Sequence, residues 1–576
     1  MGVEERILEA LNTGYTSLDE IMSKREFGGK IGGYTRMRGM IRYFLEQEIY
    51  VHSLIDSQSN DEFLLDPFSC ESFDEHRSQF KIGRFGSRNV YTFASIPTNT
   101  LFGTYFLDVN SEDLSYNPCE DKFEDCVIKL YDFTKELDSF EDFENFNLSE
   151  EFSRVKNSSL NYSDSKSQVL HEVKLNEMLD IISIVEFKDV NEKNDDILLE
   201  NHFDSKERNT CKYVEEKESR YSLTFHVISY KKIPSYSPIR CVEVGYDGFK
   251  GNVLPPKHVC EILNSLIKIK FPNLETVADL YNMAVNYIAK SVCEDNYVLA
   301  EYILLCICNR RKLQFESRNE VDNHYKLPPI VLHISFCDKG FVKRLREFLQ
   351  RNISRITWLD LDISTINNSH ITPHFDEEKN KFITGSLQFP LYRNIVVIDE
   401  TTLQEGELAS RGIENMSNVA SLVNYGRVNY GFPAYQVPIE TETNNIILSD
   451  NGKSVVCSQL DISISSKYKV TAKGKIENKE PFNLERELIN YLGLYISIVS
   501  SCEEMIHFDK STQEYIADKF VEIRQKLSPG DTQIHPSIIH NWILLSRTQA
   551  LLNGEESLTS LRFDKFIQLE KERLNI

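Results

Sequence analysis

Four consecutive β-branched residues, Ile395 to Ile398, form the centre of the run NIVVIDE at residues 394–400. An apolar run of this length, without alternating polar residues, predicts a strand buried on both faces, as in the middle of a parallel sheet. Two acids, Asp399 and Glu400, end the run. Open α/β sheets bind their ligands beyond the carboxyl ends of the strands. The two acids therefore stand where such a sheet places its chemistry, although a buried strand that happens to end in surface acids has the same pattern.

The pattern around this strand predicts an α/β core. Residues 330–336 are a second buried run, and residues 341–353 carry apolar side chains at helical spacing, so together they predict a strand, a turn and a helix. Three more strands are expected at 356–363, 445–449 and 460–464, and amphipathic helices at 484–508, 513–527, 535–552 and 561–574. We expect a five-stranded, mostly parallel core at 326–470, a helical lid at 471–576 and a helical connector at 271–325. This is the plan of an AAA+ ATPase module.

The first half of the chain has the shorter periodicity of β-strands. Polar and apolar residues alternate at 34–43 and 48–54, and similar strands are expected at 90–96, 101–106, 126–133, 171–187 and 222–230. Strands separated by long loops predict a split oligonucleotide/oligosaccharide-binding (OB) type barrel at 31–270, after a helix and loop at 1–30. Acidic inserts at about 110–122, 137–167 and 191–217 interrupt it. They are disordered docking segments or solvated insertions, and we favour insertions.

The turn where an ATPase would carry its phosphate loop does not have the required pattern. A Walker A loop needs Gly, four residues, then Gly-Lys-Ser/Thr, so that backbone amides wrap the phosphates. Here the turn contains only Cys337, Asp338, Lys339 and Gly340, and the Asp338 carboxylate would repel phosphate. Gly-Lys-Ser at 452–454 follows the acidic strand instead of preceding it and lacks the first glycine, so we interpret it as a turn. No nucleotide or other cofactor is expected.

Composition narrows the class of partner. The net charge of −23 disfavours a dedicated nucleic-acid binder and favours a basic protein partner. A basic and aromatic strand face, made of Arg36, Arg38, Arg42 and Tyr50, leaves binding of single-stranded nucleic acid as an alternative. We favour the simpler interpretation, a solvated strand face. The twelve cysteines lack metal-ligand spacing, which indicates a reducing compartment and no metal site. No signal peptide and no apolar run of the roughly 20 residues needed to span a membrane is expected.

Several strings resemble the minichromosome maintenance complex-binding protein family. They are AEYILLCICNRR at 300–311, GSLQFPLYRNIVVIDETTLQEGEL at 385–408 and FVEIRQKL at 520–527. The resemblance is good from about Val298 to Ile576 and patchier from Tyr34 to Tyr230. It implies a degenerate AAA+-like protein of the nucleus that binds minichromosome maintenance helicase subunits, promotes their remodelling or removal from chromatin, and supports DNA replication and sister-chromatid cohesion.

The same resemblance implies a role without catalysis. Ser537 occupies the position of the helicase sensor arginine, and Asn451 is similar to the polar sensor that follows the next strand. Asp399 and Glu400 are then a structural remnant of the Walker B pair, capping the following turn. Between Glu400 and Asn451 the only basic residues are Arg411 and Arg427, against six acids, so pore-loop contacts with DNA are not expected. The alternatives are a divergent ATPase that completes its site with a partner's residues, and single-strand binding by the OB-like region.

Overall fold

The computed structural model describes the barrel strands, the α/β core and most of the C-terminal helices. The described residues are 34–56, 59, 61–64, 80–95, 126–137, 173–189, 221–232, 255–309, 329–353, 355–376, 381–390, 394–457, 462–467, 486–502, 509–526 and 538–574. The expected helix and loop at 1–30, the strand at 101–106 and the acidic inserts, apart from Leu137, lie outside them. By internal contacts the chain divides into two compact units, Met1–Ile96 with Pro118–Lys232, and Pro97–Asn117 with Ile233–Ile576.

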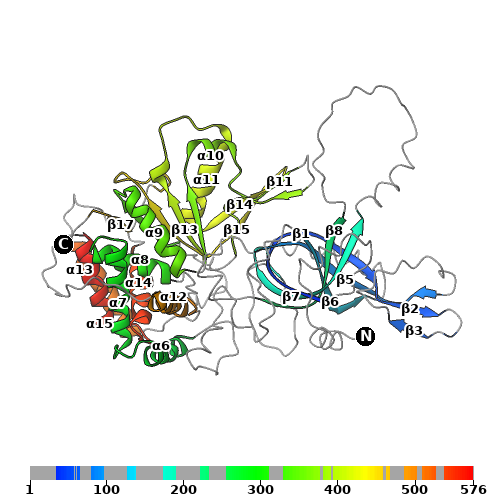
Figure 1. The fold of residues 1–576 in the computed structure, drawn as a ribbon, viewed down its shortest axis with the longest axis horizontal. Helices are drawn as coiled ribbons and strands as arrows, with labels where there is room; N and C mark the ends of the chain where they lie inside the picture. Colours follow the sequence, from blue (N-terminus) through cyan, green and yellow to red (C-terminus); the bar gives the residue numbers. More distant parts are fainter. Residues whose placement is uncertain are drawn as a thin grey trace. The chain divides into compact units, whose positions relative to one another are not determined.

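The first unit is built on a closed barrel of five strands (Figure 1). The strand order is β1-β5-β6-β8-β7, and β6 pairs with β8 in parallel whereas the other four pairs are antiparallel. Alternate residues, including Met37, Phe93, Ile128 and Phe225, point inward and form its core. The strands are β1 (Tyr34–Val51), β5 (Phe85–Ala94), β6 (Cys126–Leu137), β7 (Met178–Asp189) and β8 (Tyr221–Lys232).

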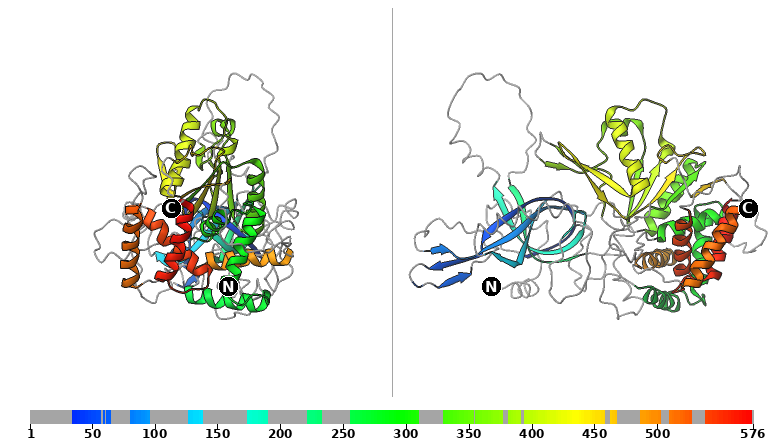
Figure 2. Two further views of the ribbon diagram at one scale, coloured as in Figure 1. Left: turned by 90° about the vertical axis from the view of Figure 1, so that its left-hand side faces the viewer. Right: turned by 180° about the vertical axis from the view of Figure 1, so that it is seen from behind.

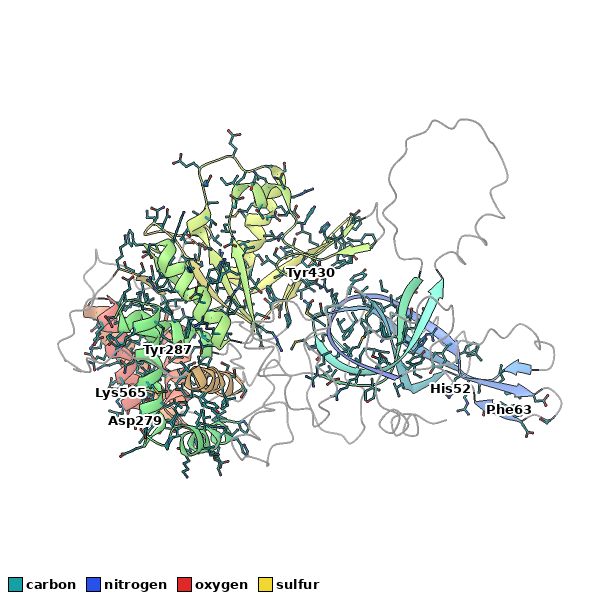
Figure 3. The ribbon with its side chains drawn as sticks, viewed as in Figure 1. His52, Phe63, Asp279, Tyr287, Tyr430 and Lys565 are labelled. Carbon is teal, nitrogen blue, oxygen red and sulfur yellow. The ribbon has the colours of Figure 1, made fainter. Side chains whose placement is uncertain are left out.

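Strand β1 joins the two strands expected at 34–43 and 48–54. Register shifts at Ile41/Tyr43 and Phe44/Glu46 interrupt its pairing with β5, and such bulges let one strand bend from one side of a barrel to the next. Beyond it, a small sheet of order β3-β2-β4 projects from the barrel, made of β2 (Ser53–Asp56), β3 (Glu62–Leu64) and β4 (Phe80–Ile82). Figure 3 shows His52 and Phe63 on this projection. The sequence pattern did not predict β3 or β4.

The second unit is centred on the predicted five-stranded sheet. Its order is β10-β13-β16-β9-β17, and every neighbouring pair is parallel. All six residues of β13, NIVVID, are buried, as expected for a central strand. The strands are β9 (Val331–Ser335), β10 (Ile356–Asp360), β13 (Asn394–Asp399), β16 (Thr443–Leu448) and β17 (Ile462–Ser465). The parallel sheet is therefore confirmed.

Helices that precede, interrupt and follow the sheet in the sequence cover one of its faces. Ile395 and Val397 share one apolar core with the helices before, within and after the sheet. These helices are α6 (Pro256–Lys270), α7 (Val277–Ser291), α8 (Tyr297–Cys308), α9 (Lys339–Asn352), α12 (Arg486–Ser500), α13 (Lys510–Lys526), α14 (Ile538–Leu552) and α15 (Ser560–Leu574). Ten of the twelve residues of α8 are buried, so α8 lies inside the core. The segments expected as connector and lid thus share one core, and Figure 2 shows their helices packed together in green and in orange to red.

The opposite face is covered by α10 (Ile363–Asn368) and α11 (Ser410–Tyr425), which pack against Val396 and Ile398. A second sheet, of order β12-β11-β14-β15, extends this side, and its Tyr430 lies in the same core (Figure 3). Its strands are β11 (His374–Asp376), β12 (Lys381–Ile383), β14 (Arg427–Gly431) and β15 (Gln436–Glu440). Neither this sheet nor α11 was predicted from the sequence. The β region was also expected to extend to residue 270, whereas Pro256–Lys270 is a helix packed on α12 and α7. Within the described residues, no helix has the length and apolar character needed to span a bilayer.

Candidate functional site at the carboxyl edge of the parallel sheet

The residues singled out in the sequence gather at one edge of the sheet. Because β9, β13 and β16 are parallel, the residues that follow them lie at the same edge. Cys337 N donates to Ser449 O at 2.9 Å, which joins the turn after β9 to the segment after β16. Burial raises the pKa of the Cys337 thiol to about 12, with smaller contributions from the negative charges of Asp399, Asp338 and Asp450. The sheet thus brings the turn after β9 beside Asp399 and Glu400.

The turn between β9 and α9 leaves no room for a phosphate loop. Three residues, Phe336, Cys337 and Asp338, join the strand to the helix. Asp338 Oδ1 accepts a hydrogen bond from Phe341 N at 2.8 Å and so caps α9. Phosphate-binding loops use this same helix end to bind phosphate through backbone N–H groups. Here the chain's own carboxylate takes that position, and Lys339 and Gly340 are exposed residues of the first helical turn.

Phe336 has a backbone conformation that is uncommon for an aromatic residue. Its φ of 57° lies in the left-handed region. Ser466 Oγ donates to Phe336 O at 2.6 Å, which fixes this turn to the segment after β17. A Cβ placed on Gly452 would lie 3.4 Å from Phe336 Cζ, so the ring lies against the 451–454 turn. Phe336 therefore covers part of the edge where an α/β sheet would bind its ligand.

Asp399 caps the turn that immediately follows its strand. Its Oδ1 accepts hydrogen bonds from Thr401 N at 3.0 Å and from Thr401 Oγ1 at 2.6 Å. This carboxylate begins the 3-10 turn Glu400–Thr402 and is buried. Asp399 is thus the N-cap of this turn.

Glu400 contacts a different segment, residues 454–456, and the sequence did not predict this contact. Its Oε1 accepts hydrogen bonds from Ser454 Oγ at 2.7 Å and from Val456 N at 3.0 Å, and both of its carboxylate oxygens lie 3.1 Å from Val455 N. A buried carboxylate with this many donors has little remaining capacity to orient or deprotonate a water molecule. The only feature of the sequence that marked this segment was the turn sequence Asn-Gly-Lys-Ser at 451–454, which follows Glu400 by about fifty residues.

Asn451 is exposed and lies three residues beyond the end of β16. Its carbonyl oxygen accepts a hydrogen bond from Ser449 Oγ at 2.7 Å. The expected match to the helicase sensor arginine, Ser537, lies outside the described residues. Arg411 Nη1 donates to Asn368 O at 3.0 Å, and Arg427 forms an ion pair with Glu440 at 3.5 Å. Both arginines between Glu400 and Asn451 thus have partners within their own unit.

His333 is a buried residue of β9 that the sequence analysis did not single out. Its ring nitrogens lie 2.8 Å from Ser463 Oγ and 2.7 Å from Ser449 Oγ. Because Ser449 Oγ donates its proton to Asn451 O, it accepts from His333 Nε2, and Nδ1 then accepts from Ser463 Oγ. Burial lowers the pKa of the imidazole to about 4. A neutral His333 therefore links β9 to β17 and to the residue that directly follows β16.

In the barrel, two residues of the basic strand face, Arg36 and Arg38, form ion pairs with an acid of the protein itself, Asp180. Arg36 forms two hydrogen bonds with the Asp180 carboxylate, at 2.9 and 2.8 Å, and Arg38 Nε lies 2.9 Å from the same group. Tyr50 contacts the Tyr131 ring edge to face, with the Arg88 guanidinium 5.8 Å from the Tyr50 ring centroid. Arg36 and Arg38 thus pair with Asp180, and Tyr50 packs against Tyr131 and Arg88.

A neighbouring, partly buried cluster on the barrel contains two more ion pairs, from Arg88 and Lys129 to Glu48. Glu48 accepts from Arg88 Nε at 2.6 Å and from Lys129 Nζ at 2.7 Å. Arg88 also donates to Tyr131 Oη at 2.9 Å, and Tyr131 Oη lies 2.6 Å from His226 Nδ1. Among the described residues no group of three or more potential ligands could hold a metal ion. The eight described cysteines are all buried free thiols.

These features define a class: an α/β protein whose ligand-binding edge is filled by its own carboxylates, with a closed β-barrel in a separate unit. A family model described as "Mini-chromosome maintenance replisome factor" matches residues 159–576, and the chain belongs to this family. Curated relatives named "Mini-chromosome maintenance complex-binding protein" include one from Dictyostelium discoideum, 26% identical over 288 residues, which are 48% of this chain and 38% of the relative. Another, from Homo sapiens, is 25% identical over 277 residues, 48% of this chain and 41% of the relative. The chain thus matches about two fifths of the length of these relatives.

Proposed function

We propose that this protein binds subunits of the minichromosome maintenance helicase and acts as a regulator without catalysis of its own. Membership of the replisome-factor family and the printed names of the relatives support the choice of partner. The proposal that the protein has no catalytic activity of its own rests on the carboxyl edge of the sheet. There Asp338 caps α9, and the Glu400 carboxylate accepts hydrogen bonds from residues 454–456. No hydrolysis of nucleotide is then needed for the protein to act.

We propose that the parallel sheet is a degenerate AAA+-like module that docks on helicase subunits through surfaces such modules use on one another. We further propose that the barrel, which has five strands as an OB-fold has, is OB-like. Binding would promote remodelling of the helicase or its removal from chromatin in the nucleus, with consequences for replication and cohesion.

The test of this function is recovery of helicase subunits with the tagged full-length chain, in buffers with and without ATP, identified by mass spectrometry. Recovery of a subset of subunits in both buffers is the expected result. Recovery of no subunit would contradict the proposal.

A second candidate is a divergent ATPase, because Asp399 and Glu400 both lie at the strand end where a nucleotide hydrolase would place its acids. The discriminating measurement is calorimetric titration of the isolated chain with Mg-ATP. Binding that is lost on Asp399→Ala would favour the ATPase. Absence of heat above the dilution control is expected for the regulator.

A further inference from the structure

Three exposed apolar side chains lie on α11 and on two segments that contact its N-terminal half. They are Leu408, Ile413 and Tyr435, with 41%, 60% and 60% of their surfaces exposed. We call them the α11 patch. A Cβ placed on Gly412 would lie 3.2 Å from Leu408 Cδ2, so the Leu408 side chain lies against the first turn of α11, at the residue before Ile413. Gln436, the residue after Tyr435, donates from Nε2 to Glu414 Oε1 at 2.9 Å, so this segment is joined to the residue after Ile413.

Hydrogen bonds and ring stacking hold the backbone of the α11 patch in place. Asn367 Nδ2 donates to Glu407 O at 3.0 Å, and Asn367 Oδ1 accepts from Ala409 N at 2.9 Å. The Tyr435 ring stacks on Phe432, with centroids 4.9 Å apart and planes 12° apart. The backbones of these two residues also exchange hydrogen bonds, at 2.8 and 3.3 Å. A surface ordered in this way loses little conformational entropy when a partner binds.

Charge indicates what kind of partner fits. Glu405, Glu407 and Glu414 are exposed around the α11 patch, and the one cation among them, Arg411, donates to the carbonyl oxygen of Asn368. The segment 405–414 therefore carries three negative charges against one positive charge. Apolar anchors inside a rim of one charge are typical of a protein-binding surface, and the rim selects a partner of the opposite sign. An exposed tyrosine ring also binds an arginine guanidinium favourably.

We propose that the α11 patch is the surface through which this protein binds a basic segment of its protein partner, one with apolar side chains flanked by Lys or Arg. The inference rests on the proposed function, because it takes a helicase subunit as the protein that supplies this segment. It adds the surface and the chemistry of recognition. The acidic rim guides the approach and the three apolar side chains supply the contact area.

The test measures binding of the full chain to the purified minichromosome maintenance complex by biolayer interferometry. Ile413→Ser combined with Tyr435→Ser removes two exposed side chains without opening the core. We expect the Kd to rise at least about tenfold, because truncating central apolar anchors accounts for most binding energy at interfaces. The matched control combines Tyr425→Ser and Leu561→Ser, which lie at the far end of α11 and on α15 with 65% and 68% exposure. The Kd of this control is expected to stay within about twofold of the unaltered chain.

A second pair of variants tests the charge argument. Glu405→Lys with Glu407→Lys is expected to lower the association rate and to flatten its dependence on salt. Glu514→Lys with Glu572→Lys makes the same change of charge at exposed positions of α13 and α15, and is expected to have the smaller effect. Equal effects of the two pairs would overturn the role of the rim.

The outcomes separate this inference from the proposed function. Normal binding by the Ile413/Tyr435 variant would overturn the α11 patch while leaving helicase binding intact. No binding by the unaltered chain would overturn the proposed function and the patch with it. Self-association of the unaltered chain in sedimentation, abolished by the same variant, would assign the patch to a second copy and also overturn the proposal.

Discussion

Glu400 and Ser454 are separated by 54 residues, yet Ser454 Oγ donates a hydrogen bond to Glu400 Oε1 at 2.7 Å. The acid that a nucleotide hydrolase would keep available for water is thus bound to the chain's own backbone and hydroxyl groups. With Asp338 capping α9, this contact gives the edge of the sheet a structural role.

Replacing Glu400 with Ala is expected to lower the free energy of unfolding of the second unit by about 2–3 kcal/mol, because buried N–H groups at 455 and 456 lose a charged acceptor. Urea denaturation followed by fluorescence measures the change. Glu405→Ala is the control, since Glu405 is exposed and its loss is expected to change stability by less than about 0.5 kcal/mol. Equal losses in the two variants would contradict the structural role of Glu400.

Asp338→Ala is expected to cost about 1 kcal/mol of stability through loss of the α9 cap. Asp338→Asn keeps an oxygen acceptor and is expected to retain most of that stability. Thermal or urea unfolding of the two variants side by side measures the difference. If both variants lost the same amount, the capping explanation would fail.

Much of the second unit follows from its hydrophobic pattern, because the parallel strands and the long helices bury continuous or periodic apolar residues. Helix α11 is different. Its buried face includes Asn415 and Asn418, and Asn415 Nδ2 donates to Ile366 O at 2.7 Å and Ser369 O at 2.8 Å. Polar residues satisfied by such contacts interrupt the apolar period on which prediction relies.

The candidate site was predictable in position but not in its contacts. The strand ends placed Asp399, Glu400 and Cys337 at one edge, since parallel strands share it. The carboxylate of Glu400, however, bonds to residues 454–456 through a tertiary contact that no local pattern encodes. His333 was missed for a similar reason, because its two serine partners, Ser449 and Ser463, are distant in the sequence.

His333 is expected to make stability depend on pH. Burial lowers its pKa from the ordinary value of 6.5 to about 4 in the folded protein. The unfolded chain therefore binds a proton more readily, so the contribution of His333 is fully present above pH 6.5 and is lost as the pH falls toward 4. His333→Gln is expected to show a smaller loss of unfolding free energy between pH 7 and pH 5 than the unaltered chain. Identical pH profiles from urea denaturation would contradict this.

Glu48→Ala is expected to destabilise the barrel by about 1.5–3 kcal/mol, because it removes the carboxylate from the buried Lys129 and from Arg88. Combining it with Lys129→Met should recover part of the loss, since the buried charge is removed as well. Chemical denaturation of the single and double variants measures the coupling. A double variant no more stable than Glu48→Ala alone would count against the ion pair as the cause.

In the proposed function, this protein binds its partner without using a nucleotide of its own. The most direct measurement compares recovery of minichromosome maintenance subunits by the full chain and by its Asp399→Ala variant, each with and without Mg-ATP, quantified by mass spectrometry. We predict the same subset of subunits, in similar amounts, for both chains and in both buffers. Recovery by the unaltered chain only when ATP is present, lost in Asp399→Ala, would contradict the account and identify Asp399 and Glu400 as a working nucleotide site.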